Sequence, residues 1–191
     1  MRARLALSSS RVEVELREIV LRDKPAAFLT ASPSGTVPCL VAPDGVIDES
    51  LDVMIWALKQ TDAEGWLNMP DAGFELIDRA DGPFKQALDR TKYANRYPDI
   101  DPDEQRGIAA TFLTGLDTQI DQWIFDRPSL ADFAILPFVR QFAFIDKDWF
   151  DARPWPSLQD WLERFLASDR FANIMMKYPQ WREGDSPVLF S

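Results

Sequence analysis

The sequence predicts an α/β domain followed by an all-helical domain. Residues 12–17 alternate apolar and charged side chains, which is typical of a half-buried strand. Asp44-Gly45 is a favoured hairpin turn, and it lies between two short apolar runs. After Asp71 we find no strand pattern, and prolines separate a series of helical segments. We therefore expect a first domain at residues 1–62 and a second at residues 66–191.

Local patterns predict each element of the first domain. Residues 2–7 favour a helix, and the alternating segment extends as a strand to Val20. Pro25 suits the first position of a short helix that runs through Leu29. The short strands on either side of the turn are expected at residues 39–41 and 46–47. Residues 50–59 carry apolar side chains along one face of a helix.

In the second domain we expect helices at residues 72–79, 84–97, 103–126, 129–145 and 157–177. Ser129 and Asp132 have the spacing of an N-capping box, with Asp in the place usually held by Glu. The helix that they open is apolar almost all round, which indicates burial, and Pro137 is expected to bend it. It fits either a ligand wall or the core of the helical domain, and we favour the core.

Composition excludes several classes of function. The net charge is −10, whereas a nucleic-acid-binding protein shows a basic face. The chain contains no histidine, which excludes Ser-His-Asp and Cys-His catalysis and most zinc sites, so we expect no metal cofactor. The apolar run before Ser8 is too short for a signal peptide, and no run reaches the roughly 18 residues of a membrane span. The single cysteine excludes an internal disulfide and agrees with a reducing compartment, so we expect a cytoplasmic protein.

Val37-Pro38 stands where a strand begins, and proline cannot donate to a ladder there. A cis bond would turn the Val37 backbone outward, where it could pair with an extended peptide ligand. A trans proline that ends the preceding turn is the alternative that the residues alone favour, because cis bonds are about 5–6% of X-Pro bonds in folded proteins.

Glu49-Ser50 stands at the start of a predicted helix. A helix N-terminus offers free N–H groups and partial positive charge, so with the Ser50 hydroxyl it suits a carboxylate, while Glu49 suits an ammonium group. The alternative is an ordinary Ser N-cap beside a solvated acid. Lys24 is a candidate cation for a second carboxylate of the same ligand. We expect Cys39 to be a buried, unreactive side chain rather than a nucleophile.

These motifs together resemble the glutathione S-transferase family. Lys24-Pro25, then Ser32-Pro33 to Val37-Pro38, then Asp44-Gly45 to Glu49-Ser50 are similar to its N-terminal, thioredoxin-like domain. Ser129 to Asp132 is similar to a capping box in its helical second domain. The resemblance covers nearly the whole chain. It implies a cis Val37-Pro38 bond and glutathione bound by five residues: Lys24, Val37, Pro38, Glu49 and Ser50.

The resemblance also implies a pocket for a small electrophilic or disulfide co-substrate and, usually, a homodimer. We expect the helical domain to supply the wall of that pocket, through Phe84, Tyr93 and Trp123.

The beginning of the chain departs from the family pattern. Residues 1–7 resemble the middle of the family's first helix, which in similar relatives follows a strand and a Cys-Pro-Tyr-type turn that carries the nucleophile. We therefore expect a first domain truncated at its start, with no catalytic residue in this chain and the nucleophile upstream of Met1. A start at an internal methionine of a longer protein is the explanation that we prefer, and real loss of the segment is the other.

Two functions remain open. The first is an enzyme close to the cysteine-type, omega-like thiol transferases, with weak activity expected of this chain. The second is a non-catalytic member of the same fold that serves as an interaction or regulatory protein. A redox protein independent of glutathione is excluded, because it would need a reactive thiol and only Cys39 is present.

Overall fold

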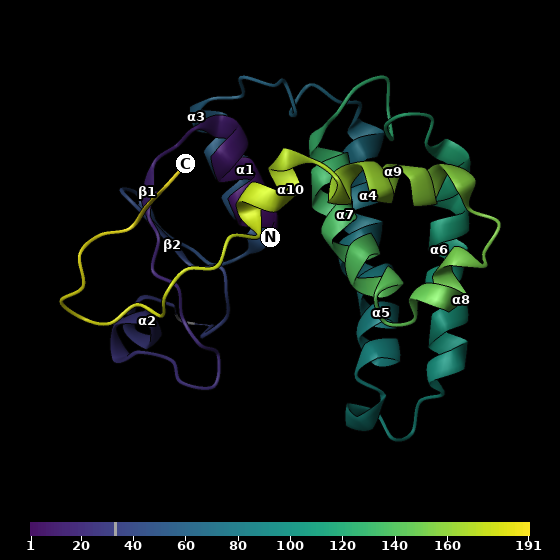
Figure 1. Ribbon diagram of the computed structural model, residues 1–191, viewed down its shortest axis with the longest axis horizontal. Coiled ribbons are helices and arrows are strands. Elements are labelled where there is room, and N and C mark those ends of the chain that lie inside the picture. Colours follow the sequence, from purple (N-terminus) through teal and green to yellow (C-terminus); the bar gives the residue numbers. More distant parts are fainter. Residues whose placement is uncertain (33) are drawn as a thin grey trace. The chain divides into compact units, whose positions relative to one another are not determined.

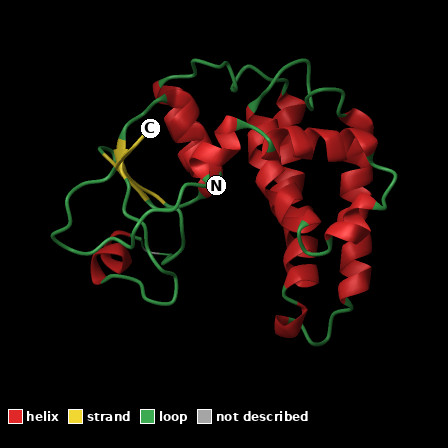
Figure 2. Cartoon of the chain, in the orientation of Figure 1, coloured by secondary structure: helices red, strands yellow, loops and turns green. Residues whose placement is uncertain are grey.

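The computed structural model describes residues 1–32 and 34–191, so Pro33 of the Ser32-Pro33 to Val37-Pro38 motif lies outside the described residues. The chain forms two compact units (Figures 1 and 2). Unit 1 contains residues 1–65 and 172–191, and unit 2 contains residues 66–171. The expected helical domain of residues 66–191 is therefore too long, because its last segment packs with the first unit. The prediction failed there because residues 172–191 have no strand pattern of their own.

Most of the elements that the sequence predicted for the first domain are present in unit 1. In chain order they are α1 (Arg2–Ser10), β1 (Val14–Glu15), α2 (Ala26–Ala31), β2 (Leu40–Ala42), β3 (Gly45–Ile47), α3 (Ser50–Gln60) and, near the end of the chain, β4 (Leu189–Phe190). Helices α1 and α3 pack together and bury their apolar faces, which include Leu5, Met54 and Leu58. Pro25 is the N-cap of α2 rather than its first helical residue, because its backbone is extended (φ −61°, ψ 147°).

The strands form two antiparallel pairs. The predicted hairpin is confirmed, since β2 pairs with β3 through Leu40 with Ile47, Val41 with Val46 and Ala42 with Gly45. β1 pairs with β4, which the sequence did not predict. The long strand expected over residues 12–20 is wrong in extent. Only β1 forms a ladder, and the residues after it are held by single bonds, such as that from the Leu16 N–H to the Val188 carbonyl (2.7 Å).

Unit 2 is helical. Its elements are α4 (Asp71–Arg79), the π-helical turn η1 (Ala80–Phe84), α5 (Lys85–Lys92), the 3-10 turn η2 (Ala94–Arg96), α6 (Pro102–Gln119), α7 (Leu130–Ala143), α8 (Lys147–Asp151) and α9 (Pro156–Leu166); α10 (Asp169–Ile174) crosses from unit 2 into unit 1. No helix in the described ranges is long and apolar enough to cross a membrane.

Three predicted helices are shorter than expected. The helix over residues 84–97 is reduced to α5, which ends at Lys92 and is followed by the separate 3-10 turn η2. The helix over residues 103–126 ends at Gln119, and the Ile124 N–H donates instead to the Asp132 carboxylate (3.0 Å). The helix over residues 157–177 is interrupted after Leu166. There the Ser168 hydroxyl accepts from the Phe171 N–H (3.1 Å), and a new helix, α10, begins beside it.

The predicted capping box is confirmed, and its acid organises the core of unit 2. The Asp132 carboxylate accepts from the Ser129 N–H (2.9 Å), the Ser129 hydroxyl (2.8 Å), the Ile124 N–H (3.0 Å) and the Trp161 indole N–H (3.1 Å). Its side chain is fully buried, and this burial raises the pKa of Asp132 against the opposing effect of its hydrogen bonds. One carboxylate therefore joins α7, α9 and the loop that precedes α7. The helix that Ser129 opens is nearly all buried, as expected if it belongs to the core of the helical domain.

Candidate functional site

The β2–β3 hairpin brings the two predicted motifs together at its open end. The ladder ends where Leu40 pairs with Ile47, so residues 37–39 and 48–50 both leave the hairpin at the end opposite its turn. The Glu49 backbone is extended (φ −95°, ψ 132°). We call residues 37–39 and 48–50 the hairpin mouth. Two segments that are separate in the sequence thus leave neighbouring strands at the same end of the hairpin.

The first side of the hairpin mouth carries an outward-facing valine. The Val37–Pro38 bond is cis, as the resemblance implied. The Val37 side chain is 48% exposed, and its main chain has no hydrogen bond to another described residue. Its N–H and carbonyl are therefore available to an extended peptide.

The second side is the N-terminus of α3. Glu49 is the N-cap residue and Ser50 is the first residue of the helix, so the ordinary Ser N-cap that we considered is wrong. No side chain caps this end among the described residues, and its first N–H groups keep their donor capacity. Glu49 is exposed and Ser50 is half-buried. N–H and hydroxyl donors that could bind a carboxylate thus lie next to the Glu49 carboxylate, which could accept from an ammonium group.

Lys24 approaches the same region from another loop. Its ammonium lies beside the Gly35 turn, since a Cβ atom built on Gly35 would be 3.9 Å from Lys24 Nζ. Gly35 has a left-handed backbone (φ 64°) that glycine adopts without strain. Lys24 is exposed and forms no ion pair with any described residue. A cation therefore stands near the turn that leads into Val37-Pro38.

Cys39 lies at the hairpin mouth but lacks the properties of a nucleophile. Its side chain is half-buried rather than buried as expected, because it stands at the open end of the ladder. Burial raises the pKa of the Cys39 thiol and the Asp48 carboxylate adds to this, while a hydrogen bond with Ser32 opposes it. A thiol with a raised pKa is protonated at neutral pH and reacts poorly.

The three aromatic residues expected at a co-substrate pocket are not gathered together by any contact between described residues. Phe84 is 1% exposed and stacks on Phe112 (ring centroids 4.6 Å apart), so it belongs to the core of unit 2. Tyr93 is half-buried beneath the guanidinium of Arg96 (4.4 Å from the ring centre). Trp123 is half-buried and lies near Phe133 (6.1 Å between ring centroids).

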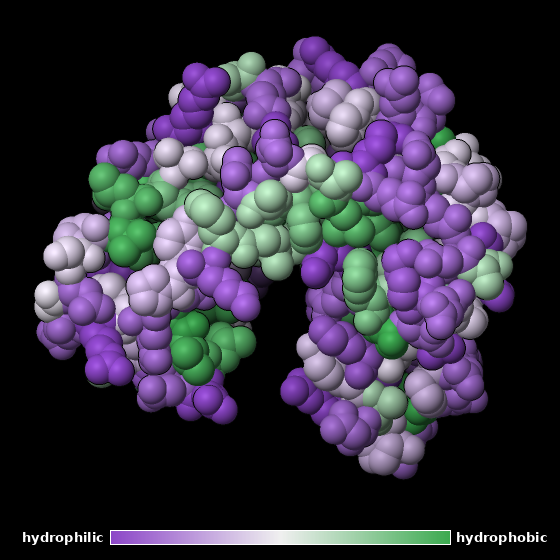
Figure 3. All heavy atoms as spheres, viewed as in Figure 1, coloured by the Kyte–Doolittle hydropathy of each residue, from purple (hydrophilic) through white to green (hydrophobic). Residues whose placement is uncertain are grey.

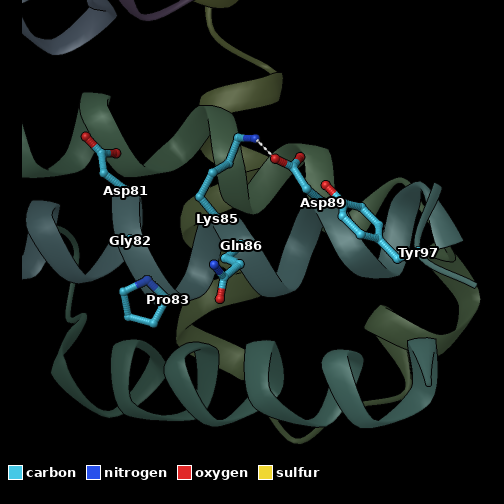
Figure 4. Close-up of a pocket in the computed structure, with 7 residues that line it drawn as sticks. All are labelled: Asp81, Gly82, Pro83, Lys85, Gln86, Asp89 and Tyr97. Atoms are coloured by element: carbon cyan, nitrogen blue, oxygen red, sulfur yellow. Dashed lines mark hydrogen bonds and ion pairs between the residues drawn. The ribbon is translucent and has the colours of Figure 1, made fainter. Parts of the chain in front are cut away.

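Unit 2 has a surface hollow that sequence reasoning missed (Figure 4). It is lined by Asp81, Gly82, Pro83, Lys85, Gln86, Asp89 and Tyr97, and Lys85 forms an ion pair with Asp89 inside it. Charged residues four apart on one helix commonly form a solvated face, so no sequence pattern indicated a hollow here. Its lining mixes charged side chains with Gly82, Pro83 and the ring of Tyr97, whereas most small-molecule sites are lined mainly by apolar side chains.

No group of three or more Cys, Asp or Glu side chains in the described part of the chain could hold a metal ion.

Two protein-family models match this chain. Residues 1–65 match the family model described as the glutathione S-transferase N-terminal domain, and residues 75–164 match that of the C-terminal domain. The chain belongs to the glutathione S-transferase family. The predicted fold is thereby confirmed, with a thioredoxin-like N-terminal domain and a helical C-terminal domain. The assignment to an omega-like subtype stays a prediction. A comparison with curated proteins gives no match.

Solved glutathione transferases share the fold at low identity. A Phanerochaete chrysosporium glutathione transferase in complex with oxidized glutathione superimposes with a TM-score of 0.75 at 15% identity, over 91% of this chain and 88% of that one. BphK, a bacterial glutathione S-transferase in a ternary complex, gives 0.73 at 19% identity over 91% and 92%. A Pseudomonas putida glutathione transferase with glutathione disulfide bound gives 0.73 at 17% identity over 91% and 84%.

Proposed function

We propose that this chain binds glutathione at the hairpin mouth and transfers it to, or removes it from, a small electrophilic or disulfide co-substrate. The observation that carries the proposal is that Val37-Pro38 and Glu49-Ser50 leave the β2–β3 hairpin at the same end, with Lys24 beside Gly35. Glutathione is an extended peptide with a zwitterionic head and a second carboxylate at its far end. The solved relatives that contain glutathione or its disulfide support this ligand class.

Each part of the ligand has a proposed partner. Glu49 takes the α-ammonium group of the γ-glutamyl head, and the Ser50 hydroxyl with the first N–H groups of α3 takes the α-carboxylate. The Val37 N–H and carbonyl pair with the cysteinyl backbone, as an added strand would. Lys24 takes the glycyl carboxylate. Pro38 shapes the backbone on which Val37 is presented.

In the proposed reaction the thiolate of glutathione is the nucleophile. It attacks an electrophilic carbon and displaces a leaving group, or it attacks a disulfide sulfur and releases the other sulfur as a thiolate, and its proton goes to solvent. Cys39 takes no part, because burial raises its pKa. We expect slow turnover from this chain and place it nearest to the cysteine-type, omega-like thiol transferases. We also propose a cytoplasmic homodimer with a role in detoxification.

A non-catalytic interaction protein with the same fold is the second candidate. The cross-strand pair Val41 and Val46 is exposed (68% and 45%), and Leu21 and Leu29 of the same unit are exposed as well. Figure 3 shows such apolar side chains at the surface among hydrophilic ones. Exposed apolar area favours protein contacts. The glutathione-matched charges at the hairpin mouth have no use in that function, so we rank it second.

Thermal unfolding with and without glutathione tests the first proposal. Ligand at a hundred times its Kd should stabilise the chain by about 2.7 kcal/mol and raise its midpoint. Glu49→Gln and Ser50→Ala should lose most of this shift, whereas Lys59→Ala, at the other end of α3, should keep it. A folded chain with no shift would contradict glutathione binding and favour the interaction protein.

Turnover separates the two functions further. Glutathione consumption should be followed with a chlorodinitrobenzene and with hydroxyethyl disulfide. Binding accompanied by turnover of either compound above the uncatalysed rate supports the enzyme. Binding without turnover of these or related substrates would favour the non-catalytic protein.

A further inference from the structure

Residues 175–191, which we call the C-terminal tail, run beside the segment of unit 1 that leads to Lys24. In Figure 1 the yellow end of the chain follows the purple strand β1. The tail pairs with β1 through Val14 with Phe190 and Glu15 with Leu189. Farther along, the Trp181 N–H donates to the Glu18 carbonyl (2.8 Å). The tail therefore runs antiparallel to residues 14–18.

Two arginines of unit 1, Arg4 and Arg17, attach the tail and the end of α10 through their side chains. The Arg4 guanidinium donates to the carbonyls of Ile174 (3.2 Å) and Met176 (3.3 Å) and lies 5.2 Å from the ring centre of Tyr178. The Arg17 guanidinium lies 4.7 Å from the ring centre of Trp181. Guanidinium groups stack well on aromatic faces, so these contacts hold the tail in register.

The last contact reaches the loop that carries Lys24. The half-buried Gln180 donates its side-chain amide to the Asp23 carboxylate (3.3 Å). Asp23 is also fixed from its own side, because its N–H donates to the Val20 carbonyl (2.8 Å). Lys24 is the next residue, and its ammonium reaches the Gly35 turn. The tail thus contacts the loop at Asp23, the residue that precedes Lys24.

We propose that Gln180 is a positioning residue, which holds the Asp23–Lys24 loop so that Lys24 meets the glycyl carboxylate of glutathione. This inference rests on the proposed function and deepens it, since it makes the C-terminal tail part of the ligand site. Lysine is a strongly hydrated cation on a flexible stem, so its affinity for a carboxylate depends on how much freedom its backbone must lose on binding. Anchoring Asp23 in the free protein removes part of that loss.

Isothermal titration with two peptides tests the role of Gln180. Glutathione carries the glycyl carboxylate, and γ-glutamylcysteine lacks it. Gln180→Ala should weaken glutathione binding about threefold, the size expected for loss of one exposed hydrogen bond, and leave γ-glutamylcysteine binding unchanged. Gln60→Ala, which removes an exposed amide bonded only to Trp56 in α3, should change neither affinity. A merely structural role of Gln180 would weaken both peptides equally.

A double-mutant cycle tests whether Gln180 acts through Lys24. In the Lys24→Ala background, Gln180→Ala should have no further effect on glutathione affinity. An undiminished further loss there, or equal losses for both peptides, would overturn the positioning role while glutathione binding stands. If the wild-type chain binds neither peptide, the proposed function fails and this inference fails with it.

Discussion

The two units of this chain are stabilised in different ways. Unit 2 has a continuous apolar and aromatic core that is connected by one buried carboxylate, that of Asp132. Unit 1 has two ladders of two and three residue pairs, one helix pair and a tail that is attached by single contacts. The candidate site lies in unit 1. Ligand-binding segments are commonly drawn from the less stable parts of a protein, and the comparison predicts which substitutions affect stability and which affect binding.

The largest effect is expected from Asp132→Ala in unit 2. The Ile124 N–H and the Trp161 indole N–H would both lose their acceptor in a buried place. Because each unsatisfied buried donor costs about 1–3 kcal/mol, the free energy of unfolding should fall by about 3 kcal/mol or more. Urea unfolding followed by circular dichroism measures this. Asp160→Ala, which removes an exposed partner of Arg164 on α9, should cost under about 1 kcal/mol. Equal losses in the two variants would show that Asp132 does not organise the core.

The next effect is expected from Arg4→Ala in unit 1. This change removes the hydrogen bonds to the Ile174 and Met176 carbonyls, the ion pair with Glu18 and the stacking on Tyr178. We expect a loss of about 2 kcal/mol, since charged hydrogen bonds contribute about 1.5–3 kcal/mol and partly exposed ones less.

Hydrogen exchange shows where the Arg4 variant opens. Amides of the tail and β1 should exchange faster, while those of α7 in unit 2 should keep their protection. Arg22→Ala, an exposed arginine in the loop before Lys24, serves as the control and should leave the tail protected. Faster exchange across both units would mean that they unfold together, and the comparison between them would fail.

The smallest effect on the free energy of unfolding is expected from glycine-to-alanine substitutions at a matched pair of positions. Gly35→Ala forces a side chain onto a left-handed backbone (φ 64°) and should cost about 1–2 kcal/mol. Gly82→Ala in unit 2 meets nothing within 4 Å of its new Cβ, so it should be neutral or should stabilise the helix by up to about 1 kcal/mol. Thermal unfolding of both variants measures the difference. A stabilising Gly35→Ala would contradict the turn geometry beside Lys24.

Local patterns were sufficient for much of the fold. The Asp44-Gly45 hairpin and the Ser129–Asp132 capping box were predicted because a few neighbouring residues determine each of them. The early ends of two of the helices were not predicted. They depend on distant or competing acceptors, such as the Asp132 carboxylate that takes the Ile124 N–H. Helical periodicity does not reveal such competition.

The candidate site was also predictable only where neighbouring residues determine it. The departure of Val37-Pro38 and Glu49-Ser50 from the same end of the hairpin follows from the Asp44-Gly45 turn, which the sequence predicted. The choice of Lys24 as a ligand-binding cation rested on the family resemblance, and its approach to Gly35 was not predicted, because no local pattern links the two residues. Gln180 was missed altogether, since its contact with Asp23 joins residues 157 positions apart. The expected pocket of Phe84, Tyr93 and Trp123 relied on residue type alone, and aromatic residues in a helical domain also build its core.

The pairing of β1 with β4 has a consequence for how the protein is made. The two strands lie on either side of the whole of unit 2 in the chain, so residues 66–171 are synthesised between them. Unit 1 cannot close its β1–β4 ladder until the ribosome has passed through the helical unit. Contacts of such long sequence separation form slowly, whereas helical units rich in local contacts form quickly. The second unit in the chain is therefore expected to fold first, and the tail contacts beside the candidate site are expected to form last.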